Sequence, residues 1–514
     1  MLHHLLTKIK AKRGAFFMNN GTLLAAIDIG SNSFRLEIGR YDHGHIARVE
    51  YLKEMVRQGA GLDADRMLSE VSMQRGWDCL ARFAERLQGF ERAHVRAVAT
   101  QTLREAKNRD VFIQKAQTIL GFPIEVISGL EEARLIYQGV TRLLPQSNER
   151  RLVVDIGGRS TEIMRGQGYQ AQAMDSFRLG SVAWSQRYFP QGHFTAEAFQ
   201  TAEIAAQAVL DEALDLFPRQ QWDVAYGSSG TVGAISDALL ANGKTQDDII
   251  TREHLDWLLD RLLKAQHADQ VKLEGIKDDR RQVIGGGLSV LRAVFDLFNI
   301  ESMTAAQGAL RQGALYDLVA RESDESDVRE RTVCWLSERF SVDAAQAHRV
   351  STVAAALFTQ IATPNAQRER HSCKLQWAAR LHELGVHISH EDAHHHGAYV
   401  LEHVDAPGFS MVELQRLSLL VLGQRGKLRK LELWLNNDEL LVKQLWCLRL
   451  AVLLCHARRD PQYQALALQW HKNRHIHLQA PSVWAKHHPQ SAWLIQEEAQ
   501  AWQKVGWRMT YQFD

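Results

Sequence analysis

The sequence contains one short motif twice, with the same order of residue types. AAIDIGSNSFRLEI around Asp28 and LVVDIGGRSTEIM around Asp155 each consist of an apolar strand with Asp-Ile-Gly at its end, a turn of small polar residues and a second strand. The two aspartates lie 127 residues apart. A repeat at the length of a domain predicts a duplicated fold with two facing lobes.

Strand and helix signals alternate through the first half of the chain. Residues 71–90 have helical apolar spacing, whereas residues 95–99 and 124–127 are short apolar runs of the strand type. Ser128 precedes a new helical run, as an N-cap does. A third turn rich in Gly and Ser, residues 226–231, lies between another short strand and a helix. This alternation predicts an α/β fold.

The composition changes near residue 320, where a charged stretch indicates a boundary. Helical spacing dominates from there to about residue 460, and 15 of the 23 histidines lie after residue 340. Alternating apolar residues return near the end, which predicts strands. We therefore expect five parts: an N-terminal extension (1–17), two α/β lobes (18–137 and 138–320), a mainly helical domain (321–460) and a small α+β C-terminal domain (461–514).

Bulk composition excludes several classes of protein. Lys and Arg number 61 against 60 Asp and Glu, and the formal net charge of +1 excludes a globally basic nucleic-acid binder, so we expect no DNA partner. Five scattered cysteines without a CxxC pair are typical of free thiols in a reducing compartment. The basic first 17 residues lack an apolar core, so we expect no secretory signal, and no apolar run is long enough to span a membrane. These features predict a cytoplasmic protein.

Both repeated turns have the chemistry of an anion site. A buried aspartate at the end of an apolar strand is costly unless it is paired or bound to metal. Turns rich in Gly and hydroxyl groups present backbone N–H groups that bind phosphate. The alternative is two Asx-capped hairpins that bind no ligand. We favour phosphate binding, because two such turns in register are joined by the third turn at residues 226–231.

Six motifs in one order carry a resemblance to a known family. They are IDIGSNSFRL, TQTLREAKN, VISGLEEARLIYQGV, VVDIGGRSTEI, GSSGT and GALRQGALYD, within residues 25–317. The two turns resemble those of the actin, Hsp70 and sugar-kinase superfamily, and the whole set resembles the exopolyphosphatase / guanosine pentaphosphate phosphatase family. The resemblance begins near Thr22 and includes a later segment, LHELGVHISHEDAHHHGAYVLEHVDAPGF. It implies ribonuclease H-like lobes, an HD-like helical third domain and a small C-terminal domain.

The resemblance also implies the roles of particular residues. Glu132, the second Glu of the EEARL segment, matches the catalytic base, and Glu162 matches a second carboxylate that orients water or metal. Asp28, Asp155 and Glu162 are expected to bind Mg²⁺ or Mn²⁺, since Mg²⁺ prefers carboxylate and phosphate oxygens. For Glu132 the alternative is a first-turn glutamate that only stabilises its helix. The expected phosphate-binding residues are Gly30, Ser31, Asn32, Ser33, Arg104, Gly157, Gly158, Ser160, Thr161, Gly230 and Thr231.

Two of these positions carry open alternatives. Arg104 matches an arginine of the family that is suited to clamping phosphate, and its alternative is an ordinary surface arginine. Arg159 stands where the family usually has glycine, so its side chain must either point away from the phosphate or contact it. QGALRQG also lacks the glycine pair expected of an adenosine-binding turn, which argues against a kinase or an actin-like filament protein.

The histidine-rich third domain raises a metal hypothesis. His382-Glu383, expected inside an apolar helix, and His348 upstream resemble part of an HD phosphohydrolase site, while His394, His395 and His396 are expected in a loop. HD chemistry normally uses a His-Asp pair as metal ligands. Because this pair is His-Glu, we favour a degenerate, structural HD fold, with an adventitious metal site as the alternative.

The function implied by the resemblance is removal of a terminal phosphate. We expect an exopolyphosphatase that releases orthophosphate from inorganic polyphosphate, with the 5′-phosphohydrolysis of guanosine pentaphosphate as the alternative, because both use the same site. In this family a long polyanion lies against cationic residues and the enzyme is often a dimer, so we expect a homodimer. A solvated charged face is the alternative to a polyanion track, which we assign to Arg425, Lys427, Arg429 and Lys430.

Overall fold

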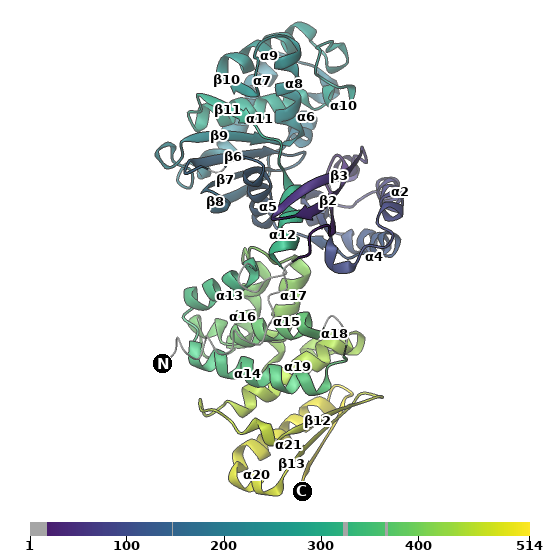
Figure 1. Cartoon of the computed structure of the whole chain (residues 1–514), viewed down its shortest axis with the longest axis vertical. Coiled ribbons are helices and arrows are strands. Elements are labelled where there is room, and N and C mark those ends of the chain that lie inside the picture. The colour runs from purple at the N-terminus through teal and green to yellow at the C-terminus, as the bar shows by residue number, and fades with distance from the viewer. Residues whose placement is uncertain (1–17, 146, 322–326, 365–367) are drawn as a thin grey trace. The chain divides into compact units, whose positions relative to one another are not determined.

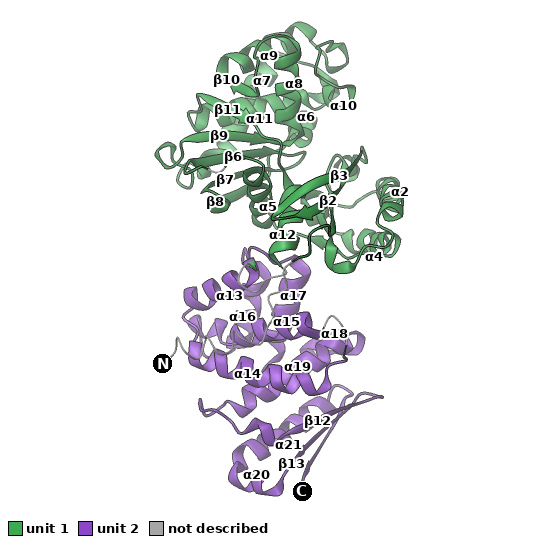
Figure 2. Cartoon of the chain, in the orientation of Figure 1, with its two compact units in different colours: residues 1–327 green, residues 328–514 purple. Residues whose placement is uncertain are grey.

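A computed structural model describes residues 18–145, 147–321, 327–364 and 368–514. The chain divides into two compact units, residues 1–327 and residues 328–514 (Figure 2). The predicted extension, residues 1–17, lies outside the described residues. The finer division into two lobes, a helical domain and a C-terminal domain stays a prediction.

The first sheet of unit 1 has the strand order β3-β2-β1-β4-β5. Two of its strands, β2 and β3, are labelled in Figure 1. The antiparallel hairpin of β1 and β2 is the first copy of the repeated motif, and β4 and β5 lie parallel to β1. The inner strands bury nearly every residue, which their near-continuous apolar runs predict. The strand bounds are β1 Leu23–Ile29, β2 Phe34–Asp42, β3 His45–Glu54, β4 Val95–Ala99 and β5 Ile124–Val126.

The second sheet repeats this arrangement. Its order is β10-β11-β9-β6-β7-β8, so that β8, β7, β6 and β9 follow one another as β3, β2, β1 and β4 do. Strands β6, β7 and β8 are antiparallel neighbours, and β9 is parallel to β6. The duplicated α/β fold predicted from the two motifs is therefore confirmed. The strand bounds are β6 Arg150–Ile156, β7 Thr161–Gln167, β8 Gln170–Phe177, β9 Val224–Ser228, β10 Ile249–Thr251 and β11 Ser302–Ala305.

Helices surround both sheets, and α5 and α12 pack directly on each other. A Cβ on Gly139 of α5 would overlap the carbonyl oxygen of Ala309, and one on Gly313 of α12 would overlap that of Leu135, so the crossing requires glycine. The helix bounds in unit 1 are α2 Glu70–Arg86, α3 Gln101–Glu105, α4 Arg109–Leu120, α5 Gly129–Arg142, α6 Ser181–Tyr188, α7 Ala196–Leu210, α8 Ser229–Ala241, α9 Arg252–Ala265, α10 Asp278–Arg281, α11 Ile284–Leu297 and α12 Leu310–Ala320.

A buried ion network fixes α5 and α12 against β4. The Arg96 guanidinium contacts Glu131 at 3.1 Å and Asp317 at 2.6 Å, and Arg134 contacts both of these carboxylates as well. Neighbouring arginines hold the pKa of Asp317 far below its ordinary value although the carboxylate is buried. The network therefore positions the start of α5, where Glu132 lies.

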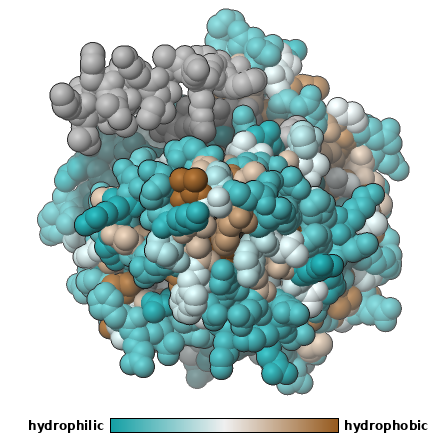
Figure 3. All heavy atoms as spheres, turned by 90° about the horizontal axis from the view of Figure 1, so that it is seen from below, coloured by the Kyte–Doolittle hydropathy of each residue, from teal (hydrophilic) through white to brown (hydrophobic). Residues whose placement is uncertain are grey.

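Unit 2 is helical up to residue 454 and ends in a three-stranded sheet. Strands β12, β13 and β14 confirm the alternation predicted near the C-terminus. The face in Figure 3 is mainly hydrophilic, with small hydrophobic spots between polar side chains. The element bounds are α13 Val328–Arg339, α14 Ala344–Ile361, α15 Arg368–Arg380, α16 Ala393–His403, α17 Met411–Gly423, α18 Glu432–Asn437, α19 Glu439–Leu454, β12 Ala467–His471, β13 His475–Ala480, α20 Ser482–His487, α21 Pro489–Gln503 and β14 Arg508–Phe513.

Two predicted positions in unit 2 are wrong. His382 and Glu383 do not lie inside a helix, because α15 ends at Arg380 and the chain turns before a short 3₁₀ helix, Leu384–His387. The break lets Gly385 approach the backbone of α16 so closely that a Cβ would overlap the Ala393 carbonyl oxygen. The three consecutive histidines, residues 394–396, lie in the first turn of α16 and not in a loop. Their helix continues because its other face is apolar and packs in the core.

Candidate active site

The structure brings the three predicted turns together at the carboxyl ends of β1, β6 and β9. A Cβ built on Gly158 would lie 3.4 Å from Cβ of Ser31 and 3.9 Å from Cβ of Asn32, so the turns of the two lobes face each other closely. The third turn begins α8, where Ser229 adopts a positive φ of 99°. A Cβ built on Gly230 would meet the Arg280 guanidinium, so this cation lies directly against the third turn.

Several of the predicted phosphate-binding hydroxyls serve the turns themselves. Thr161 Oγ1 donates to the Leu179 carbonyl at 2.5 Å, and Thr231 Oγ1 donates to the Ile156 carbonyl at 3.1 Å. Ser31 Oγ accepts from Thr102 at 2.8 Å, and Ser33 Oγ accepts from Arg35 at 3.1 Å. These hydrogen bonds fix the conformation of the turns, whose backbone N–H groups would bind an anion.

Four buried carboxylates lie around these turns. Asp28 ends β1, Asp155 ends β6, Glu162 lies opposite Asp155 on β7, and Glu132 lies in the first turn of α5. Ser128 caps α5, because its Oγ accepts from the Glu131 N–H at 3.1 Å. Glu131 itself belongs to the ion network with Arg96, so only the second glutamate of the EEARL segment joins this group.

Burial, and repulsion from neighbouring carboxylates, raises the pKa of Glu132, Asp155 and Glu162. Burial, together with repulsion from Asp28, raises the pKa of Asp155 to about 6. Burial and the neighbouring Glu132 and Asp155 raise the pKa of Glu162 well above its ordinary value, although Ser176 Oγ donates to it at 2.7 Å. Burial raises the pKa of Glu132, and Arg104 opposes that rise. Several buried carboxylates this close together require cations that neutralise their charge.

Arg104 answers this requirement at Glu132. Its Nη1 donates to Glu132 Oε2 at 2.7 Å and to the Ile127 carbonyl at 3.0 Å, and two other nitrogens donate to Gln101 Oε1. The surface alternative is excluded, since the side chain is only 13% exposed. Its predicted role as a phosphate clamp stays a prediction. Arg159 also has a partner across the two lobes: its Nη2 donates to Glu105 Oε2 at 3.0 Å.

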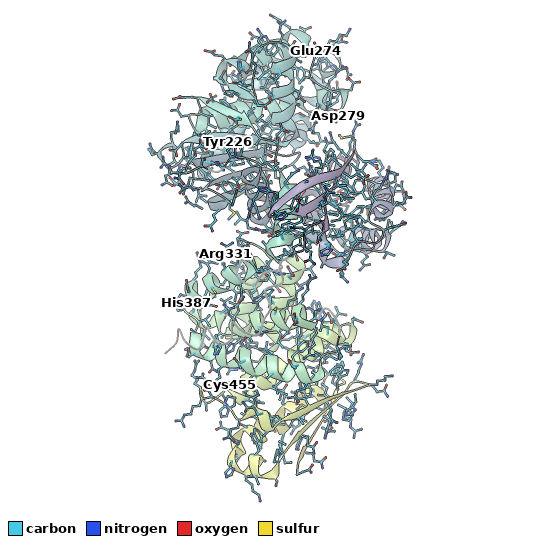
Figure 4. The ribbon with its side chains drawn as sticks, in the orientation of Figure 1. Tyr226, Glu274, Asp279, Arg331, His387 and Cys455 are labelled. Atoms are coloured by element: carbon cyan, nitrogen blue, oxygen red, sulfur yellow. The ribbon has the colours of Figure 1, made fainter. Side chains whose placement is uncertain are left out.

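Sequence reasoning missed four cations near the turns, two of which lie next to Asp28. Arg35 and Arg311 lie 3.6 and 3.7 Å from Asp28 Oδ2, and Arg311 Nη1 is buried without a hydrogen-bond partner. Lys53 of β3 donates to Asp279 of α10 at 3.3 Å; Asp279 is labelled in Figure 4. Burial and repulsion from Arg280 lower the pKa of Lys53, and burial and repulsion from Arg35 lower the pKa of Arg280.

One signal in the sequence points to the first of these cations. When the two repeats are aligned on their aspartates, Arg35 takes the place of Glu162. The others come from β3, α10 and α12, which lie far apart in the chain and carry no motif around them.

The expected metal has donors of a suitable type here. Asp28, Asp155 and Glu162 supply buried carboxylate oxygens, the ligand type that Mg²⁺ and Mn²⁺ take, but their oxygens are not all within 4.8 Å of one another. Within the described residues that spacing is met by a group in unit 2, Asp392, His394 and His395. His382 and Glu383 do not belong to that set; Glu383 accepts from Arg458 at 2.5 Å. The predicted track residues Arg425, Lys427, Arg429 and Lys430 lie in the segment between α17 and α18.

The fold and the site define a class of duplicated α/β proteins in which glycine- and hydroxyl-rich turns of two lobes face each other beside buried carboxylates. The sequence matches the Ppx/GppA phosphatase family over residues 38–322, and Ppx/GppA phosphatase, domain III over residues 328–499. The chain therefore belongs to the Ppx/GppA phosphatase family. Within the described residues no helix has the length and apolar character needed to cross a membrane.

Individual relatives agree with this assignment. A protein of Photobacterium profundum named guanosine-5'-triphosphate,3'-diphosphate pyrophosphatase is 39% identical over 491 residues, which cover 94% of this chain and 97% of the relative. The crystal structure of an exopolyphosphatase-like protein has a TM-score of 0.53 at 27% identity, covering 58% of this chain and 98% of its own. The Aquifex aeolicus family member has a TM-score of 0.50 at 25% identity, covering 59% and 98%.

Proposed function

We propose that this protein hydrolyses the 5′-terminal phosphate of guanosine pentaphosphate, giving the tetraphosphate and orthophosphate. The observation that carries the proposal is the 39% identity, over nearly the full length of both chains, to a relative named for that substrate. Exopolyphosphatase activity, which the sequence analysis put first, becomes the second candidate. It is supported by the structural likeness of 58% of this chain to an exopolyphosphatase-like protein.

The chemistry follows from the carboxylates and their neighbours. Hydrolysis needs a water in line with the scissile P–O bond and a base to receive its proton. Glu132 is the candidate base, because burial raises its pKa and so its affinity for a proton, while Arg104 and the start of α5 favour its ionised form. Asp28, Asp155 and Glu162 would hold Mg²⁺, which would neutralise charge that develops on the transferred phosphoryl group.

The cations that the sequence reasoning missed suit a substrate with many negative charges. Burial and then mutual repulsion lower the pKa of Lys53 and of Arg280, and Arg35 is among the charges that repel each of them. An anion placed among them would relieve this repulsion and gain several charge-assisted hydrogen bonds. A guanosine pentaphosphate carries its five phosphates in two separate chains, and a polyphosphate carries its phosphates in one continuous chain. Either can meet this cluster while its terminal phosphate lies at the turns.

The decisive experiment compares substrates under one condition. Orthophosphate release from guanosine pentaphosphate, long-chain polyphosphate and ATP would be measured on the full chain with Mg²⁺. We expect the highest kcat/KM for guanosine pentaphosphate. A higher kcat/KM for polyphosphate would overturn the proposal in favour of the second candidate, and preference for ATP would overturn both.

A further inference from the structure

An unbroken series of side-chain hydrogen bonds joins the phosphate turn of the second lobe to Glu132. Arg159 Nη2 donates to Glu105 Oε2 at 3.0 Å, and the other oxygen of Glu105 accepts from Gln101 Nε2 at 2.6 Å. Gln101 Oε1 accepts from Arg104 Nη2 at 2.6 Å and from Nε at 3.1 Å. The third nitrogen of Arg104 donates to Glu132 Oε2 at 2.7 Å.

Arg159 is the one member of this series that comes from the second lobe. It lies in the turn between β6 and β7, at the position that Asn32 holds in the first repeat, and its side chain reaches across to α3 of the first lobe. A Cβ built on Gly59 would lie 3.1 Å from Arg159 Cδ and 3.1 Å from Cβ of Ser31, so the side chain passes beside the first-lobe turn. Its Nε is buried without a hydrogen-bond partner.

The series of hydrogen bonds runs in one donor-to-acceptor order, because the chemistry of each group fixes which atoms donate and which accept. Glu105 only accepts, so the Gln101 amide must turn its NH₂ group toward Glu105 and its oxygen toward Arg104. The reversed amide would place NH₂ against the guanidinium and lose all three bonds of Gln101. With its Nε and Nη2 held on that oxygen, Arg104 presents Nη1 to Glu132 in one orientation.

The ion pair that starts the series is largely withdrawn from water. The side chains of Arg159 and Glu105 are 20% and 16% exposed, so their attraction is screened less than that of a surface pair. The pair exists only when the turn of the second lobe lies against α3. The arrangement at Glu132 thus depends on the approach of the two lobes.

We propose that Arg159 is a positioning residue, which closes the second-lobe turn onto Glu105 and, through Gln101 and Arg104, holds Glu132 where it can receive the proton of the attacking water. The proposal rests on the proposed function, since it needs Glu132 as the base. It gives this chain a connection from the phosphate turn of the second lobe to the base.

Steady-state hydrolysis of guanosine pentaphosphate by Arg159→Ala and Glu105→Gln tests the proposal. A displaced base costs rate, so we expect kcat to fall about ten- to hundredfold, with KM changed less than the rate. Arg159→Lys keeps the charge and should recover part of the loss. Arg187→Ala removes an exposed arginine of α6 that takes no part in the series and should match the wild type.

The charge-swapped double variant, Arg159→Glu with Glu105→Arg, separates this proposal from a simple latch between the lobes. Arginine at position 105 cannot accept from Gln101, so kcat should stay low, whereas a latch would be restored. Recovery of wild-type kcat by the swap would overturn the proposal, as would an Arg159→Ala variant in which only KM changes. Arg159→Gly provides a second variant if the alanine protein does not fold.

Failure of the proposed function is a separate outcome. If the wild-type protein prefers polyphosphate over guanosine pentaphosphate, the proposed function fails, and the same variants measured on polyphosphate still test the series. If Glu132→Gln keeps wild-type kcat on every substrate, the base assignment fails and the proposal for Arg159 fails with it.

Discussion

Asp155 and Glu162 lie directly opposite each other on the antiparallel strands β6 and β7, in the register that Asp28 and Arg35 occupy on β1 and β2. In the first lobe the pair consists of a carboxylate and a guanidinium, and in the second lobe it consists of two carboxylates. Opposite residues of an antiparallel pair share one face of the sheet, so two buried carboxylates repel each other there. The two lobes thus share the same strand register, but the pair in the second lobe needs a cation to neutralise its charge.

This requirement predicts that the enzyme needs Mg²⁺ or Mn²⁺. In excess chelator, phosphate release should fall to background, and added Mg²⁺ should restore it. Glu162→Gln removes one of the two acids and should raise the Mg²⁺ concentration needed for half-maximal rate. Glu197→Gln, at an exposed position of α7, is the matched control and should leave it unchanged. Full turnover in chelator would contradict the metal assignment.

The second prediction concerns Glu132, whose carboxylate accepts from Arg104. Glu132→Gln keeps the size of the side chain but removes the base, and loss of a base typically costs about 10²–10⁴-fold in kcat. The circular dichroism spectrum and Tm should stay close to those of the wild type. A variant that retains more than about a tenth of the wild-type kcat would show that another group receives the proton.

The sequence predicted the parts of the site that form continuous motifs. The two repeated hairpins, the strand at residues 95–99 and the helix after Ser128 all follow from apolar spacing and local turn chemistry. The presence of Lys53, Arg280 and Arg311 near the site could not be predicted. They lie on β3, α10 and α12, which are far apart in the sequence and come together only in the folded protein. The prediction of a helix around His382 was also wrong. The apolar spacing of a helix continues through this segment, but the close approach of Gly385 to α16 breaks the helix. Tertiary contacts decided both cases.

A third prediction follows from the pKa of Asp155, which burial raises from an ordinary 3.8 to about 6. The unfolded chain releases this proton at lower pH than the folded chain, so the folded state loses stability as pH rises through that window. In chelator at pH 7.5, Asp155→Asn should therefore be more stable than the wild type by up to about 3 kcal/mol. The advantage should disappear near pH 4. Urea unfolding of both proteins at the two pH values measures it, and a constant difference would contradict the assignment.

The buried network around Asp317 predicts a large effect on stability. Asp317 contacts Arg96 at 2.6 Å and also Arg134 and Arg321, with a side chain only 3% exposed. Asp317→Ala leaves buried arginines without their partner, which typically costs about 3–5 kcal/mol. Asp215→Ala, at an exposed position in the turn after α7, is a suitable comparison. A loss below about 1 kcal/mol for Asp317→Ala would show that the arginines find other partners.

The last prediction uses the predicted polyanion track to distinguish between the two candidate substrates. Arg425, Lys427 and Arg429 are exposed, and Lys430 is half-buried with Nζ donating to the Arg425 carbonyl at 3.2 Å. A substrate held through the phosphate turns needs none of these cations, whereas a long polyanion gains from every charge it meets. Replacing all four by Gln should leave kcat/KM for guanosine pentaphosphate unchanged. If the segment binds polyphosphate, the same variant should raise KM for long chains and weaken the salt dependence of their binding, because fewer screened charge contacts remain. Unchanged KM and salt response for long chains would show that these cations form only a solvated face.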